Sequence, residues 1–120
     1  MTPENQRIAI ARVCGYLPDP ETGLWYRLGD EDKAGFNVVV QRIERLPDYL
    51  NDLNTMHEAE KVLMADQQDS YQNGLGNLVQ GKPFEEYNHW SNVGCAFVAH
   101  ACALQRAEAF LKTLALWTED

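Results

Sequence analysis

The pattern of apolar and polar positions is most regular over Leu46–Met64, and its period is that of a helix. The apolar residues fall close to the i, i+3, i+4, i+7 spacing of a helix: Leu46, Tyr49, Leu50, Leu53, Met56, Leu63 and Met64. This spacing predicts a helix that buries one face. Pro47 suits the first turn of such a helix, because its missing amide proton would have no partner there.

Three further segments carry helical patterns. Thr2 and Pro3 form a start signal for a helix that ends near Gly15, and its apolar residues cover more than half of its circumference. We expect this helix to be sandwiched between the sheet and another helix or subunit. Ala101–Trp117 predicts a second strong helix. Asp66–Gln80 predicts a helix that frays or ends early, because two glycines lie inside it, at 74 and 76.

Strand patterns occupy three segments. Leu24–Leu28 and Phe36–Ile43 are rich in bulky and β-branched residues and predict an antiparallel hairpin, and Asn92–Ala99 predicts a third strand. Leu17–Gly23 and Gly81–Ser91 are expected to be loops. The resulting order, αββααβα, predicts one α+β domain over residues 1–120, in which helices flank a small antiparallel sheet in a sandwich-like arrangement. A sheet this small has edges to cover, which favours a homodimer or a higher homo-oligomer.

Composition narrows the functional classes. The chain has 120 residues, 45% of them hydrophobic, and a formal net charge of −8. That charge argues against binding to a nucleic-acid polymer, because such binding needs a basic surface. Three cysteines without CxxC spacing indicate reduced thiols in the cytoplasm. No segment resembles a signal peptide or a membrane span, so no membrane partner is expected.

Catalytic and metal-binding patterns are absent from the sequence. The three histidines and three cysteines lack the paired spacing of a structural metal site, and there is no GxSxG motif. Gly74-Leu75-Gly76 lacks the lysine of a phosphate-binding loop. We therefore expect neither an enzyme nor a bound cofactor or metal.

A binding surface for a small ligand is the remaining chemical signal. The loop Gly81–Ser91 is rich in aromatic residues that could stack on a purine, and nearby asparagines could hydrogen-bond to bases or ribose. The candidate residues are Phe84, Asn88, Trp90 and Asn92, with Trp25 from the hairpin. The alternative, which we favour for each ring taken alone, is that these aromatics close one end of the core.

Arg106 in the last helix has two alternatives of similar weight. Its guanidinium could bind a phosphate, or it could pair with Glu108 or with an acid elsewhere in the chain. Arg27, Arg42 and Arg45 are expected to be surface residues.

Three segments carry a resemblance to a known family: ENQRIAIARVCGY, PDYLNDLNTMHEAEKVL and FVAHACALQRAEAFLKTLALW. In this order they resemble the phage ABA-sandwich domain family, which implies an antiparallel sheet between helices and a phage or prophage origin. The chain is also similar to the Thoeris anti-defence sponge proteins of phages. Those proteins form homo-oligomers and bind cyclic ADP-ribose isomers without cleaving them, and some also hold cyclic oligonucleotides of CBASS immunity. The resemblance implies Arg106 as a phosphate contact, and Phe84 with Asn88 or Asn92 as base or ribose contacts.

These observations favour a phage protein that sequesters a small cyclic nucleotide or a cyclic ADP-ribose-type defence signal in the host bacterial cytoplasm. The alternative is an acidic phage protein that inhibits a host protein by direct contact. The acidic residues are scattered along the chain, and this favours the first hypothesis. An enzyme acting on a nucleotide ranks last.

Overall fold

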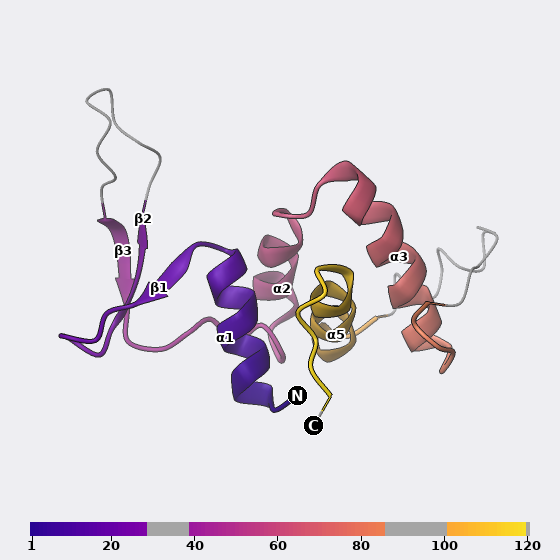
Figure 1. Ribbon diagram of the computed structural model, residues 1–120, viewed down its shortest axis with the longest axis horizontal. Coiled ribbons are helices and arrows are strands. Elements are labelled where there is room, and N and C mark those ends of the chain that lie inside the picture. The colour runs from indigo at the N-terminus through magenta and orange to yellow at the C-terminus, as the bar shows by residue number, and fades with distance from the viewer. Residues whose placement is uncertain (29–38, 86–100, 120) are drawn as a thin grey trace.

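The computed structural model describes residues 1–28, 39–85 and 101–119, and these form an α+β fold with an antiparallel sheet (Figure 1). The first half contains the helix α1 (Pro3–Val13) and the strands β1 (Tyr16–Pro18), β2 (Trp25–Leu28) and β3 (Val39–Ile43). The second half contains the helices α2 (Leu53–Glu60), α3 (Ala65–Val79) and α5 (Ala103–Thr113). The predicted fold class is confirmed. None of the described helices is long and apolar enough to cross a bilayer.

The helix α1 begins and ends where its sequence signals predict. The Thr2 hydroxyl accepts a hydrogen bond from the Asn5 amide at 3.2 Å, which satisfies one of the unpaired donors of the first turn. Pro3 occupies the first turn. Gly15 follows the helix with a φ of +97°, a left-handed conformation that glycine adopts without strain.

The predicted single helix over Leu46–Met64 is wrong in its extent. The structure has a turn-containing loop up to Asp52, the short helix α2, another turn, and then the start of α3 at Ala65. The Asp52 carboxylate accepts hydrogen bonds from the amides of Asn54 and Thr55 at 3.0 and 3.3 Å, so it caps α2 six residues beyond the predicted start at Leu46. The predicted helix is therefore shortened at both ends. The capping aspartate sets its start, and a turn after Glu60 ends it before Met64.

The helix α3 continues through both of its glycines to Val79. A Cβ added at Gly74 would collide with the ring of Phe84, so this glycine provides the space in which the ring packs. The Asn77 side-chain amide donates to the Phe84 carbonyl at 3.0 Å and holds the following loop against the helix. The weak helix propensity of glycine is thus offset by tertiary packing.

The sheet has the order β1-β2-β3, with both pairs antiparallel. The predicted hairpin strands are confirmed as β2 and β3. The strand β1 lies partly in the segment predicted as a loop, because Tyr16 pairs with Arg27 and Pro18 with Trp25. The predicted strand Asn92–Ala99 lies outside the described residues.

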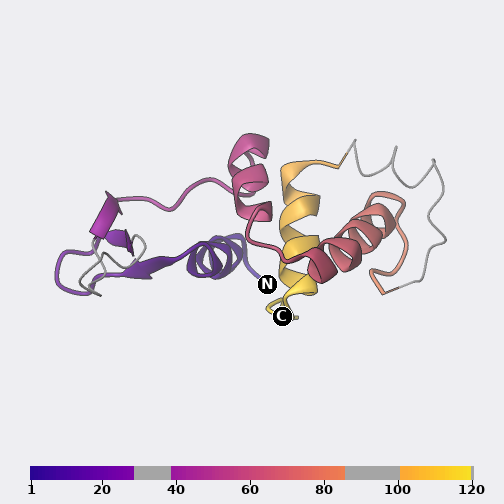
Figure 2. The ribbon, with the colours of Figure 1, turned by 90° about the horizontal axis from the view of Figure 1, so that it is seen from above.

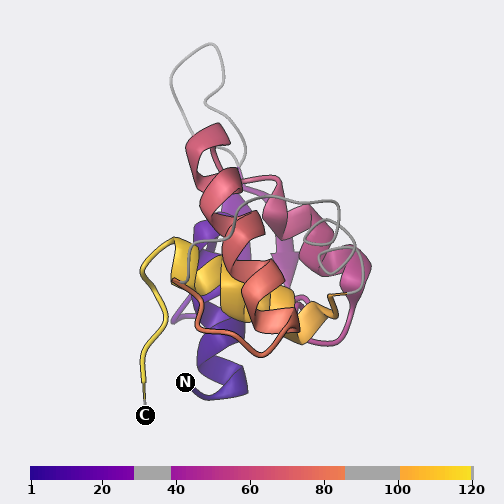
Figure 3. The same cartoon turned by 90° about the vertical axis from the view of Figure 1, so that its right-hand side faces the viewer.

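The helices gather around α5, and the sheet lies beyond α1 at one end of the molecule (Figures 1 and 2). Figure 3 shows α3 crossing in front of α5, and these two helices pack closely. The fully buried core side chains come from all four described helices and include Ile10, Met56, Tyr71, Leu75 and Phe110. The helix α1 contacts β1, the strand that follows it in the chain, and it also contacts α5. This position accounts for the wide apolar surface of α1.

Candidate functional site

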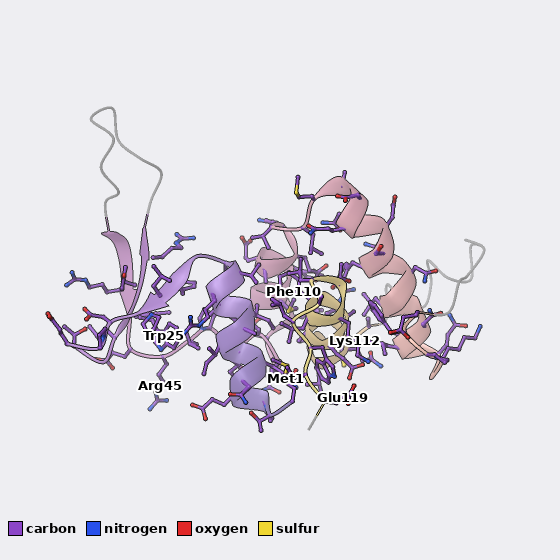
Figure 4. The ribbon with its side chains drawn as sticks, viewed as in Figure 1. Met1, Trp25, Arg45, Phe110, Lys112 and Glu119 are labelled. Carbon is purple, nitrogen blue, oxygen red and sulfur yellow. The ribbon has the colours of Figure 1, made fainter. Side chains whose placement is uncertain are left out.

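A groove of about 540 Å³ lies between α1, the start of β2 and the segment that follows β3. We call it the Trp25 groove, after the aromatic residue that lines it. Figure 4 shows Trp25 and Arg45 beside α1. Its lining residues are Glu4, Arg7, Ile8, Trp25, Glu44, Arg45, Leu46 and Asp48.

The antiparallel register of the hairpin builds this groove. Trp25 pairs with Ile43, so the chain that leaves β3 passes close to Trp25 and brings Glu44 and Arg45 beside it. From the opposite side, α1 contributes Glu4 and Arg7, which are three residues apart and therefore share a face of the helix. The groove thus combines one indole ring with two guanidinium groups.

The two arginines of the groove differ in their partners. Arg7 Nε lies 3.8 Å from Asp48 Oδ1, at the outer limit of an ion pair, and both side chains are partly exposed. Arg45 is exposed and has no ion pair or hydrogen bond with any residue that the structure describes. Arg45 is therefore the cation of this groove that is available to a ligand.

A second groove, of about 600 Å³, lies between the loop after α3 and the end of α5. We call it the Phe84 groove; its lining residues are Pro83, Phe84, Glu85, Lys112, Ala115, Trp117 and Glu119. Figure 4 shows Lys112 and Glu119 at this end of α5.

The cation of the Phe84 groove is already engaged. The Lys112 ammonium lies 5.8 Å from the ring centroid of Phe84 and 5.4 Å from that of Trp117, and it pairs with Glu108 at 3.4 Å. The Glu108 carboxylate offsets the charge of the lysine, and the ammonium lies over the faces of both rings. The Trp25 groove is therefore the better candidate for an anionic ligand.

Arg106 lies in the core, only 7% exposed, and lines neither of these two grooves. Its Nη1 lies 3.3 Å from each carboxylate oxygen of Glu60, and its Nε donates to the Ala101 carbonyl at 3.2 Å. The acid that partners it is Glu60 of α2, while Glu108 pairs with Lys112. The burial of the guanidinium favours the structural alternative for Arg106, and its contact with a phosphate stays a prediction.

Of the other predicted site residues, two line the grooves and three lie in the part of the chain that the structure does not describe. Trp25 lines the first groove and Phe84 the second. Asn88, Trp90 and Asn92 lie outside the described residues. The sequence predicted Arg45 as a surface residue but did not place it beside Trp25, because that position depends on a strand register that contains a bulge at Arg27 and Leu28.

Tyr71 lies beside the buried ion pair of Glu60 and Arg106. Its side chain is fully buried, and its hydroxyl makes no hydrogen bond of ordinary geometry with a described residue. Burial raises the pKa of this hydroxyl above its ordinary value, and the negative charge of Glu60 raises the pKa further. The phenol is therefore strongly held in its neutral form.

We expect this raised pKa to make the protein less stable in alkali. Above pH about 10 the tyrosine ionises in the unfolded chain but not in the folded one, so the free energy of unfolding falls by about 1.4 kcal/mol per pH unit for one such group. Urea denaturation between pH 8 and pH 11.5 measures this fall. Tyr71→Phe is expected to be at least as stable as the wild type at pH 7 and to show a shallower fall. If the free energy of unfolding falls equally steeply with pH in the two proteins, the raised pKa of Tyr71 is not the cause of the fall.

Comparison with protein-family models, with curated proteins and with solved structures finds no match to this chain. Within the described part of the chain, no group of three histidine, cysteine, aspartate or glutamate residues is placed to hold a metal ion.

Proposed function

We propose that this protein binds a small nucleotide-derived ligand in the Trp25 groove and sequesters it without cleaving it. The observation that carries the proposal is that Trp25 and Arg45 line one groove of about 540 Å³, and that Arg45 has no partner among the residues that the structure describes. Small-molecule sites commonly measure about 300–1,000 Å³.

The two groups suit the two halves of a nucleotide. An indole ring can stack on a base, a contact worth about 1–3 kcal/mol. A guanidinium donates paired, charge-assisted hydrogen bonds to phosphate oxygens. Arg7 lines the same groove, but it pairs with Asp48 at 3.8 Å, so Arg45 is the guanidinium that we assign to the phosphate.

The resemblance to phage sponge proteins suggests the biological setting. In that setting the ligand is a cyclic nucleotide or a cyclic ADP-ribose isomer made by bacterial immunity, and the protein works as a homo-oligomer in the host cytoplasm. Sequestration lowers the free concentration of the signal, and this requires binding but no reaction.

Recovery of intact ligand tests the proposal. The protein is incubated with cyclic ADP-ribose isomers and with cyclic mono-, di- and trinucleotides, separated from free ligand and heat-denatured, and the released molecules are identified by mass spectrometry. Intact ligand supports the proposal. A cleaved product would make the protein an enzyme, and retention of none of these molecules would remove the proposal.

Arg45→Ala is expected to weaken binding of a retained nucleotide by roughly 10- to 150-fold, because a charge-assisted hydrogen bond is worth about 1.5–3 kcal/mol. Isothermal titration calorimetry measures the change. Arg12→Ala is the matched control, because Arg12 is an exposed arginine of α1 that does not line the groove. A similar loss in both variants would indicate a general charge effect and would argue against a contact at Arg45.

The second candidate function is inhibition of a host protein by direct contact, and the net charge of −8 favours it. In that case Arg45→Ala would leave the inhibition intact, and a defined host protein would co-purify with the wild type and the variant alike.

A further inference from the structure

The charges that line the Trp25 groove restrict the kind of ligand it can hold. Two arginines face three carboxylates, those of Glu4, Glu44 and Asp48. Asp48 is the partner of Arg7, so these two charges largely cancel. What remains is one guanidinium, that of Arg45, and two carboxylates.

The two remaining carboxylates have no partners within the described chain. Neither Glu4 nor Glu44 makes a hydrogen bond or an ion pair with a described residue, and both are exposed. A carboxylate only accepts hydrogen bonds, so these two groups suit hydroxyl or amino donors of a ligand and repel its anionic oxygens. Both residues line the same groove as Trp25.

We infer that the ligand of the Trp25 groove presents a single phosphodiester to Arg45 and hydroxyl or amino donors to Glu4 and Glu44. The inference rests on the proposed function and narrows its ligand class. The single negative charge of a ribonucleotide can pair with Arg45. A pyrophosphate carries two adjacent negative charges, and the second one would be repelled by the carboxylates of Glu4 and Glu44. Among the expected ligands, the groove therefore favours a cyclic mononucleotide over cyclic ADP-ribose, which carries a pyrophosphate.

Calorimetry with two probes tests the charge argument. We expect the wild-type protein to bind 3′,5′-cyclic AMP about tenfold more tightly than cyclic ADP-ribose in dilute buffer, because one additional charge at a protein surface is worth roughly that factor. Raising the salt concentration to 0.5 M should reduce the ratio, since screening weakens the repulsion. Tighter or equal binding of cyclic ADP-ribose in dilute buffer would overturn the inference and leave the proposed function standing.

A third probe and two variants test the donors. The 2′-deoxy analogue of 3′,5′-cyclic AMP is expected to bind about fivefold more weakly than the ribose form, because the lost hydroxyl leaves a carboxylate unpaired. In the double variant Glu4→Gln/Glu44→Gln, cyclic ADP-ribose should gain about tenfold in affinity, as repulsion is removed. Glu21→Gln is the control, because Glu21 is exposed in a loop outside the groove, and it should change neither affinity.

The outcomes distinguish a failure of this inference from a failure of the proposed function. No gain for cyclic ADP-ribose in the double variant would overturn the charge argument, even if cyclic AMP binds well. If the wild type binds none of the three probes and retains no other nucleotide, both the inference and the proposed function fail.

Discussion

Arg106→Ala is expected to lower the free energy of unfolding by about 3 kcal/mol, because it removes the arginine partner of the largely buried Glu60 carboxylate, which then keeps its contact with His57 Nδ1 at 3.0 Å. The side chains of Arg106 and Glu60 are 8% and 15% exposed, so solvent screens this pair little. The substitution also removes the hydrogen bond from Arg106 Nε to the Ala101 carbonyl. Urea denaturation followed by circular dichroism measures the change.

The exposed pair of Lys61 and Glu58 provides the control. Lys61 Nζ lies 2.8 Å from Glu58 Oε1, which is closer than the atoms of the buried pair, but the two side chains are 69% and 71% exposed. We expect Lys61→Ala to cost less than about 1 kcal/mol, because water screens exposed pairs. If Arg106→Ala also costs less than about 1 kcal/mol while nucleotide binding is lost, Arg106 belongs to the ligand site and not to the core.

Gly74→Ala is expected to destabilise the protein by about 2 kcal/mol, although alanine is the better helix former by about 1 kcal/mol. The added methyl group would occupy the space of the Phe84 ring, which the Asn77–Phe84 hydrogen bond holds over the helix. The ring must move, and Phe84 loses its packing against α3. The measured quantity is again the free energy of unfolding.

Two further variants isolate the steric cause. Ser70 is an exposed residue of the same helix. Ser70→Ala should raise the free energy of unfolding by a few tenths of a kcal/mol, because alanine has the higher helix propensity. In the background Phe84→Ala the added methyl group meets no ring, so Gly74→Ala should become neutral or stabilising. A stabilising effect of Gly74→Ala in the wild-type background would contradict the packing seen in the structure.

Local signals predicted a large part of the fold. The threonine and proline at the start of α1 form a helix cap within one turn, and the β-branched residues of the hairpin mark its strands wherever they lie in space. The hydrophobic period failed over Leu46–Met64 because it does not show where the backbone turns. Tyr49, Leu50 and Met56 are buried as the period predicts, but Leu53 and Met64 are exposed. Asp52, which lies inside the predicted helix, caps a shorter helix in the structure.

The candidate site was predicted only in part. Trp25 was recognised as a ring that a ligand could use, but its partners Arg7 and Arg45 come from α1 and from the segment after β3. Arg45 has no local feature that distinguishes it from the other surface arginines. Its proximity to Trp25 depends on the strand register, in which Trp25 lies opposite Ile43.

By itself, the sequence determined the class of fold, the ends of α1 and the presence of the hairpin, because caps, turns and strand propensity act over a few residues. Only the tertiary structure decided that Arg106 pairs with Glu60, 46 positions away, and that Gly74 makes room for Phe84. It also decided that Arg45, which has no partner within the described ranges, lies in one groove with Trp25. These are contacts between distant segments, and their energies depend on burial and geometry that no local pattern of residues encodes.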